Sequence, residues 1–406
     1  MLMVVITLGP TLPFNSIMVV GVNTRPIVKS AKALGLKTIA VDCFGDVDLL
    51  ECADAVFSMR SAKLKVQPKS SKGPSLFQLS LQALEAHYVD AILLTSGMEH
   101  DSVFIRELGK RAKIIGNDTT RLETCKNKEK LFRIADKLGI PYPLTRRVRK
   151  QDEALEVARD IGYPVVLKPA VGGGGIGIKL ARSPDELERS FRRVLLVSDN
   201  ESLYVQQYIR GIDASTSILS NGDEAKCLTV NEQVIGDKRL GVPRPFGYCG
   251  NVIPLNKPEF ESEIAENSRA ICEEIGLVGS NGVDFVLSDQ PYLMEINPRF
   301  QNTIDCVEGL LGINLVEEHI RSCKGELGKY RQPDGYSVKL ILYAKGDFEI
   351  PDLMKVRDIV DIPQPGSIIR KGKPICCVLK FGKSRHRVIA EAHDSASKVY
   401  GKLLHS

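Results

Sequence analysis

A glycine-rich segment follows an apolar, strand-like run near the middle of the chain. Lys168 stands at the end of that run, and glycine fills five of the six positions from 172 to 177. Such a loop exposes backbone N–H groups that can close over phosphates, and the lysine places a positive charge beside them. A Walker A loop is excluded because no Gly-Lys-Ser/Thr follows. A phosphate-covering loop and a flexible hairpin turn both remain open at this point.

Three oxygen-bearing side chains stand on two strand-like segments further along the chain. Glu295 and Asn297 are two residues apart, so they share one face of a strand, and Asp284 belongs to the preceding segment. If the two strands pair, the three side chains converge. Carboxylate and amide oxygens suit Mg²⁺ (or Mn²⁺) that also binds substrate phosphates. The pattern indicates a metal site, and a solvated sheet face is the alternative.

Two weaker signals lie on either side of the glycine-rich loop. Asn127 and Lys128 come at the start of an expected helix, and the run Tyr208–Ile209 is followed by a turn and Asp213. Hinge backbone groups commonly hold an adenine, and a nearby carboxylate commonly holds a ribose. Each signal alone is also typical of ordinary surface residues.

Charged residues also follow two strands in the N-terminal part. Arg25 opens a helix after Gly21, where only one glycine of a dinucleotide fingerprint is present. We therefore expect Arg25 and the helix N-terminus to face an anionic acceptor substrate rather than NAD. The loop with Ser96, Gly97 and Glu99 follows another strand end, where we expect Glu99 to hold an amine. A plain turn between strand and helix is the alternative in both places.

The order of strand-like and helix-like segments around these residues predicts an α/β protein. Strand-like and helix-like segments alternate at first, which is typical of a parallel sheet covered by helices on both faces. A two-part α+β region and a small β-rich module with a final helix follow. We expect an N-terminal extension at 1–16, a Rossmann-like domain at 17–120, an α+β domain at 121–330 with a small lid at about 121–205, and the β-rich module at 331–406.

The amino-acid composition disfavours some kinds of binding partner for this protein. The 55 basic and 50 acidic residues are interspersed and give a net charge of only +5, which disfavours a dedicated nucleic-acid binder. No apolar run reaches the roughly 18 to 20 residues of a membrane-spanning helix. The ten cysteines are scattered, as expected of buried thiols in a reducing cytoplasm. We interpret residues 1–16 as an alternative start and not as a signal peptide.

Taken together, the order of the motifs resembles the ATP-grasp superfamily over about residues 120–305. The elements are Asn-Lys, Leu-Lys-Pro, the glycine-rich loop, Gln-Gln-Tyr-Ile with a following Asp, a second Asp, and Glu-Ile-Asn-Pro-Arg. The resemblance implies an ATP-grasp unit split into two α+β subdomains. It implies catalytic roles for Arg299 and Lys168. It also implies that ATP binds to Lys128, Lys168, Gly172, Gly173, Gly174, Gly175, Gly177, Gln206, Gln207, Ile209 and Asp213, and Mg²⁺ to Asp284, Glu295 and Asn297.

The C-terminal part resembles biotin carboxylase, with Arg299 and Gln301 matching its bicarbonate-handling segment. Thr303 stands where that enzyme has its glutamate base, and Lys339 and Ile341 stand where its third domain has Glu and Arg. The resemblance therefore implies a carboxylase-like architecture with carboxylate–amine ligation through an acyl phosphate, yielding ADP and phosphate. The implied partners are a small carboxylate, a small amine and, as a class tendency, a second copy of the chain. A carboxylating enzyme and a non-catalytic ATP-binding regulator remain open alternatives.

Overall fold

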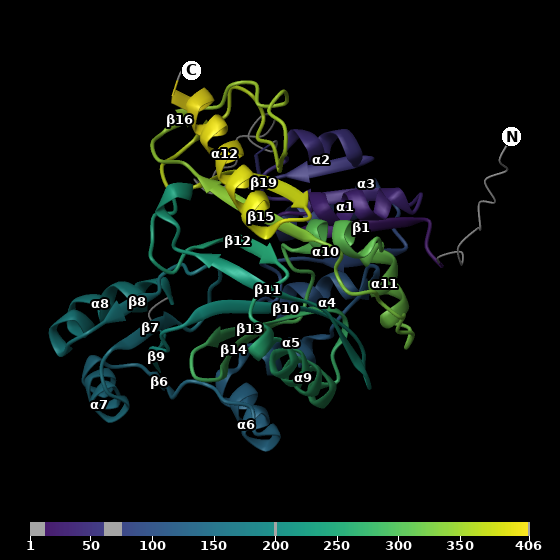
Figure 1. Ribbon diagram of the computed structural model, residues 1–406. Coiled ribbons are helices and arrows are strands. Elements are labelled where there is room, and N and C mark those ends of the chain that lie inside the picture. The colour runs from purple at the N-terminus through teal and green to yellow at the C-terminus, as the bar shows by residue number, and fades with distance from the viewer. Residues whose placement is uncertain (1–12, 61–74, 199–200, 405–406) are drawn as a thin grey trace, which may run out of the picture.

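The computed structural model describes residues 13–60, 75–198 and 201–404. Three larger β-sheets and a small two-stranded sheet organise these residues, with helices packed around them (Figure 1). The predicted α/β class is confirmed. Most of the expected N-terminal extension, residues 1–12, lies outside the described residues.

The N-terminal region forms a five-stranded parallel sheet in the order β3-β2-β1-β4-β5. All six residues of β1 are buried, because helices cover both faces of the sheet. The carboxyl ends of β1 and β4 lead into the two loops that sequence analysis singled out. The elements are β1 (Ser16–Gly21), α1 (Arg25–Ala33), β2 (Lys37–Asp42), α2 (Val47–Cys52), β3 (Ala55–Ser58), α3 (Leu76–Ala86), β4 (Ala91–Leu94), α4 (Ser102–Gly109) and β5 (Lys113–Ile115).

A smaller four-stranded antiparallel sheet in the order β6-β9-β7-β8 carries the glycine-rich loop between β7 and β8. The helix before this sheet starts at Lys128 because the Asn127 side chain caps it, accepting from the backbone N–H groups of Glu129 and Lys130. Its elements are α5 (Thr119–Lys126), α6 (Lys128–Leu138), β6 (Thr145–Val148), α7 (Gln151–Ile161), β7 (Val165–Pro169), β8 (Lys179–Ala181), α8 (Pro184–Val197) and β9 (Leu203–Gln207).

The largest sheet has eight strands in the order β14-β13-β10-β11-β12-β15-β19-β17. Its first part contains β10 (Ile212–Asn221), β11 (Ala225–Ile235), β12 (Tyr248–Ile253), α9 (Pro258–Ile275), β13 (Val278–Leu287) and β14 (Pro291–Asn297). The short helix η2 (Lys238–Leu240) lies between β11 and β12. The expected pairing of β13 with β14 is present and places Asp284 directly across from Glu295.

The C-terminal residues continue this same sheet, since β15 hydrogen-bonds to β12. Figure 1 shows the final helix, α12, lying against β15 and β19 at the end of the molecule opposite α6. The elements are α10 (Ile304–Leu311), α11 (Leu315–Ser322), β15 (Tyr336–Tyr343), β16 (Phe348–Glu349), β17 (Ile359–Val360), β18 (Ile368–Ile369), β19 (Pro374–Gly382) and α12 (Arg385–Leu404). The domain boundaries proposed from the sequence remain predictions.

Candidate active site

A cavity of about 400 Å³ lies between the four-stranded and eight-stranded sheets and gathers most of the predicted site residues. A smaller space of about 110 Å³ adjoins it beside Lys128. Residues predicted as site residues that line one or both spaces are Glu99, Lys128, Lys168, Gly172, Gly173, Gly174, Gly175, Gln206, Gln207, Ile209, Asp213, Asp284, Glu295, Asn297, Arg299 and Gln301.

Two buried lysines, Lys168 in this cavity and Lys128 in the adjoining space, contribute positive charge. Lys128 Nζ donates to the Met294 carbonyl at 2.5 Å and lies 3.8 Å from Glu295. Burial lowers the pKa of Lys128 to about 8 and also lowers the pKa of Lys168. Because burying an ammonium group is unfavourable without a compensating anion, this pair fits an anionic ligand such as a polyphosphate.

The glycine-rich loop closes against the segment before β12. Gly174, Gly175 and Gly177 have positive φ angles of 59°, 75° and 78°. A Cβ atom at Gly175 would lie 1.7 Å from the Phe246 carbonyl oxygen, so this approach requires glycine. Gly177 does not line the described cavities, and it packs instead beside Pro169 at the base of the loop.

The opposite wall of the cavity offers polar groups suited to an adenosine. Gln206 is buried, and its Nε2 donates to Thr145 Oγ1 at 2.9 Å, while its Oε1 has no hydrogen-bond partner among the described residues. That free acceptor fits a donor such as an exocyclic amino group. Burial raises the pKa of Asp213 on β10 to about 6, and the Lys168 ammonium opposes this shift.

The predicted metal ligands meet as neighbours on β13 and β14. Asp284 accepts from Gln233 Nε2 at 3.0 Å and from Asn297 Nδ2 at 2.9 Å. Burial and the Glu295 charge raise the pKa of Asp284 well above its usual range. Burial opposes ionisation of Glu295 too, but Lys128, Lys126 and Lys168 lower its pKa.

Two adjacent carboxylates with opposed pKa shifts fit a divalent cation that would relieve their repulsion. Among the described residues, no group of three His, Cys, Asp or Glu side chains is placed to hold a metal ion by itself. A cation here would therefore bind through Asp284, Glu295 and substrate phosphates, as Mg²⁺ commonly does. The Asn297 amide presently faces Asp284 with its nitrogen.

Arg299 lines the first cavity and also a second cavity, described below. Neighbouring residues hold its side chain in place. Its Nε donates to Glu99 Oε1 at 2.8 Å, and its Nη1 donates to the Phe300 carbonyl at 2.9 Å. Lys126 Nζ lies 3.8 Å from the same Glu99 oxygen. Glu99 thus positions Arg299 and Lys126, and its predicted contact with a substrate amine stays a prediction.

Gln301 fixes the turn that carries Arg299. Its Nε2 donates to the carbonyls of Asn297 and Arg299 at 3.1 and 2.7 Å. Gln301, Ser96 and Gly97 all line a second cavity of about 540 Å³. This cavity shares Glu99, Gly172, Gly173, Gly174, Tyr248, Arg299, Gln301 and Asn302 with the first.

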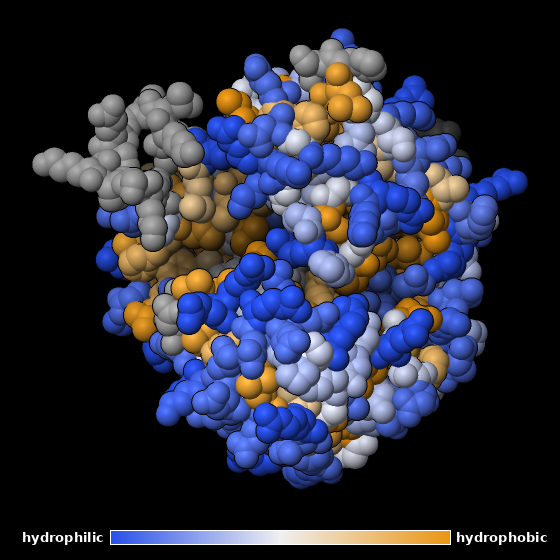
Figure 2. All heavy atoms as spheres, turned by 90° about the vertical axis from the view of Figure 1, so that its left-hand side faces the viewer, coloured by the Kyte–Doolittle hydropathy of each residue, from blue (hydrophilic) through white to orange (hydrophobic). Residues whose placement is uncertain are grey.

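The second cavity has mainly apolar walls, contributed by the N-terminal sheet region and by the C-terminal strands. Figure 2, viewed from the side of α7 and α8, shows a hollow with largely hydrophobic walls on this face of the molecule. The apolar lining residues are Val22, Pro26, Ile27, Phe44, Ile176, Phe300, Ile304, Ile341, Tyr343, Pro374, Ile375 and Cys376. Two adjoining cavities that meet at Arg299 allow a nucleotide and an organic substrate to bind side by side.

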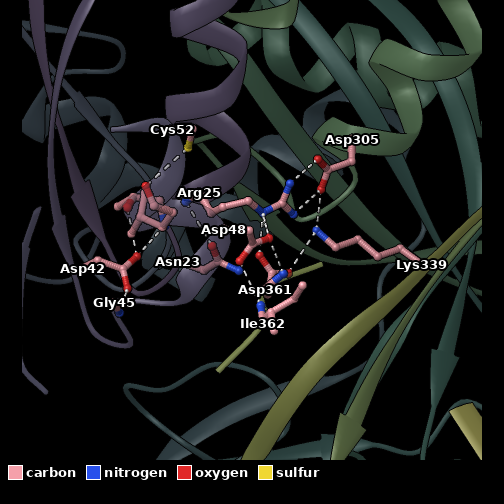
Figure 3. A network of polar contacts seen from close by, with 12 residues as sticks. Asn23, Arg25, Asp42, Gly45, Asp48, Cys52, Asp305, Lys339, Asp361 and Ile362 are labelled. Atoms are coloured by element: carbon pink, nitrogen blue, oxygen red, sulfur yellow. Dashed lines mark hydrogen bonds and ion pairs between the residues drawn. The ribbon is translucent and has the colours of Figure 1, made fainter. Parts of the chain in front are cut away.

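Arg25 does not belong to either described cavity, which corrects the prediction of an anion-binding role. Its guanidinium donates to both oxygens of Asp305 at 2.7 and 2.8 Å and to Asp361 at 2.8 Å (Figure 3). Asp48 lies 3.5 Å away, and Lys339 completes the group by donating to Asp305 at 2.7 Å. The side chain is 2% exposed, so this network uses Arg25 to join three parts of the chain.

Sequence reasoning did not assign roles to several residues that line the first cavity. Gln233 on β11 contacts Asp284, Lys126 contacts Glu99, and Tyr248 borders both cavities. Each lies outside the recognised motifs.

Residues 125–303 match the model of the ATP-grasp domain. The chain contains an ATP-grasp domain. The predicted superfamily is confirmed, and the match spans the lysines, the glycine-rich loop and the carboxylates described above.

The chain also resembles proteins of the carboxylase-related group. It is 28% identical over 369 residues to an uncharacterised protein of Methanocaldococcus jannaschii, covering 89% of this chain and 87% of that protein. It is 25% identical over 234 residues to the carbamoyl phosphate synthase large chain of Neisseria meningitidis serogroup B. That match covers 56% of this chain and only 22% of the synthase.

A solved structure has a similar fold over nearly the whole chain. It is the biotin carboxylase domain dimer of Hydrogenobacter thermophilus 2-oxoglutarate carboxylase, in complex with ADP, magnesium and bicarbonate. The TM-score is 0.74 at 20% identity, covering 94% of this chain and 89% of that one. The carboxylase-like architecture predicted from the sequence is thereby confirmed.

Proposed function

We propose that the protein is an ATP- and Mg²⁺-dependent ligase that activates a carboxylate as an acyl phosphate and joins it to an amine. The observation that carries the proposal is the meeting of two cavities at Arg299. One, with its adjoining space, is lined by Lys128, Lys168, Asp284, Glu295 and the glycine-rich loop, and the other is mainly apolar. This arrangement suits a nucleotide whose γ-phosphate faces an organic acid.

The proposed reaction proceeds in two displacements. A carboxylate oxygen attacks the γ-phosphorus, and the bond to the β–γ bridging oxygen breaks to release ADP. An amine nitrogen then attacks the acyl carbon, the bond to the phosphate oxygen breaks, and the nitrogen loses a proton to solvent. The phosphate leaves carrying one oxygen of the original carboxylate.

The residues contribute mainly charge and position. Lys128 and Lys168 neutralise phosphate oxygens, the glycine-rich loop covers them, and Arg299 faces the transferring group. Mg²⁺, bound through Asp284 and Glu295, would supply further neutralisation of the developing negative charge. The buried Gln206 oxygen supports recognition of the adenine.

Two positions argue against carboxylation as the reaction. Thr303 is 4% exposed and its hydroxyl lies 3.1 Å from that of Ser217, so no free base stands at this place. Lys339 is 1% exposed and pairs with Asp305. Neither the Thr303 nor the Lys339 side chain is therefore free to bind or deprotonate bicarbonate.

The test measures phosphate release from ATP and Mg²⁺ across combinations of carboxylates and amines, with and without bicarbonate. We expect ADP and phosphate to form only when both a carboxylate and an amine are present. Lys168→Ala and Glu295→Gln should each reduce this rate by at least about a hundredfold. Lys179→Ala, a lysine outside the described cavities, serves as the control. Release that needs bicarbonate, or AMP as the product, would refute the proposal.

By analogy with the dimeric carboxylase domain, we also propose that the chain forms a homodimer in the cytoplasm. Among the described residues, no helix is long and apolar enough to cross a membrane. Sedimentation analysis of the purified chain tests the dimer, and a single monomeric species would contradict it.

A further inference from the structure

The second cavity contains a buried carboxylate for which the described residues supply no hydrogen bond or ion pair. Asp46 is the residue before α2, is 6% exposed and lines the cavity. Among the residues that the structure describes, none forms a hydrogen bond or an ion pair within 4.0 Å with this carboxylate. An isolated buried carboxylate is unfavourable unless a ligand completes it.

Asp361, on the same cavity wall, offers a second oxygen. Its Oδ1 accepts from Arg25 Nε, but its Oδ2 is buried without a hydrogen bond in the described part of the chain. Lys339 Nζ forms an ion pair with this oxygen at 3.7 Å, and Arg25, Lys339 and the Cys377 thiol all lower the pKa of the Asp361 carboxyl. Asp361 and Asp46 thus line the same space, but Asp361 has two cationic partners and Asp46 has none among the described residues.

Among the described residues, the charges around Asp46 do not balance. Figure 3 shows Arg25 and Lys339 pointing into a group of carboxylates from Asp48, Asp305 and Asp361. Two cations, Arg25 and Lys339, thus pair with these three carboxylates, and Asp46 is a fourth carboxylate nearby. Burial, together with the charges of Asp361, Asp42 and Asp48, raises the pKa of Asp46 to about 8.

One cation approaches Asp46 without pairing with it. Arg60 lines the same cavity and its guanidinium lies 5.9 Å from the centroid of the Phe44 ring. Its charge lowers the pKa of Asp46, yet no ion pair within 4.0 Å joins them. Within the part of the chain that the structure describes, Asp46 is therefore left without an ion pair.

Arg299 stands at the other end, where the two cavities join. The groups that act on Arg299 are Glu99, Asp284 and Glu295, whereas Asp46 interacts with Asp361, Asp42 and Asp48. A molecule that fills the cavity would therefore meet a cation at its reacting end and carboxylates at its far end. Between them it would contact mostly apolar side chains.

We propose that this cavity binds an organic substrate with an apolar body and a protonated amine, whose ammonium group is held by Asp46 and Asp361 while its other end reaches Arg299. The proposal rests on the proposed function, because it names the class of substrate that reacts beside Arg299. The ammonium group at Asp46 is a recognition group and takes no part in bond formation.

The test uses three small probes of similar shape and different charge. Binding of benzylamine, benzyl alcohol and phenylacetate to the full chain is measured by ligand-observed NMR at neutral pH. Since a hydrogen-bonded charge typically contributes more than a neutral one, benzylamine should bind at least about tenfold more tightly than benzyl alcohol. Asp46→Asn should abolish that preference and leave the Kd for ATP unchanged. Asp289→Asn, the same change at an exposed site, should retain it.

Equal binding of the alcohol, tighter binding of phenylacetate, no binding of any probe, or an unchanged preference in Asp46→Asn would each overturn the proposal. The readout needs no turnover, so it is separate from the ligase test. Lys168→Ala should lose phosphate release and still prefer benzylamine. If the ligase test fails, the binding measurement still tests the preference for the amine.

Discussion

At the scale of single residues, hydrogen bonds hold the charged side chains of the site in position. Glu99 fixes Arg299 through a 2.8 Å hydrogen bond, and Lys128 is fixed by the Met294 carbonyl. These contacts keep Arg299 and Lys128 in orientations that face the site. Such preorganisation lowers the cost of binding a polyphosphate.

Glu99→Gln tests this positioning. The change keeps the size of the side chain but removes the charge that holds Arg299, so we expect kcat for phosphate release to fall by about tenfold or more. The Kd for ATP, measured by calorimetry, should change little. Glu107→Gln on the outer surface of α4 is the control. An unaltered kcat would show that Arg299 does not depend on Glu99.

His319 should make stability depend on pH. Its Nδ1 accepts from the Ser280 N–H at 2.8 Å and its Nε2 lies 3.1 Å from the Ile115 carbonyl, so the neutral ring fits both partners. Burial lowers the pKa of His319 from 6.5 to about 4. Between these values the unfolded chain binds more protons, so stability falls as pH falls from about 6.5 to about 4, by roughly 3 kcal/mol.

His319→Gln checks this assignment by urea unfolding at several pH values. The variant has no titrating ring, so its free energy of unfolding should lack this component of the pH dependence, whatever its stability at neutral pH. Identical pH slopes for both proteins would remove His319 as the cause.

At the scale of elements, the site depends on loops that meet from separate sheets. The glycine-rich loop between β7 and β8 touches the segment before β12, which belongs to the eight-stranded sheet. The close approach at Gly175 leaves no room for a side chain. The loop can therefore cover a ligand while it remains in contact with both sheets.

Gly175→Ala tests whether this closed loop matters for nucleotide binding. A Cβ there meets the Phe246 carbonyl and requires a positive φ, a combination that costs on the order of 1 to 3 kcal/mol. We expect the Kd for ATP to rise about tenfold or more. Gly401→Ala, on α12 and outside the described cavities of the site, has open space around it and no positive φ, so it should bind ATP normally. Equal affinities would contradict the role of the closed loop.

Sequence analysis captured what is encoded locally. The Asn127 cap, the glycine-rich loop and the alternation of Glu295 and Asn297 are short-range patterns, and the structure brings most of them to one cavity. Arg25 was misassigned because its partners, Asp305 and Asp361, are 280 and 336 positions away. Asp46 was not considered because nothing near it in the sequence shows that its carboxylate lies in a cavity without an ion pair from the described residues.

At the scale of the whole molecule, the network around Arg25 ties together parts of the chain that are distant in sequence. Arg25 begins α1, Asp305 lies on α10, Lys339 lies on β15, and Asp361 follows β17 (Figure 3). The same region borders the second cavity. The relative placement of the N-terminal sheet and the C-terminal strands thus depends on a buried ionic network.

Arg25→Met tests this dependence through the free energy of unfolding. Removing one partner of a buried ionic network leaves its carboxylates uncompensated, and we expect a loss of about 3 to 5 kcal/mol. Lys32→Met breaks a partly exposed pair with Asp54 and should cost less than about 1 kcal/mol. Losses of similar size in the two variants would contradict the structural role of Arg25.

The central claim is that a carboxylate is activated by direct attack on the γ-phosphate of ATP. The decisive measurement uses the carboxylate found by the phosphate-release screen, labelled with oxygen-18 in its carboxyl group, and follows the label by mass spectrometry. We predict that each phosphate released during ligation carries one labelled oxygen. Label in AMP, or unlabelled phosphate formed alongside the ligated product, would contradict the acyl-phosphate mechanism.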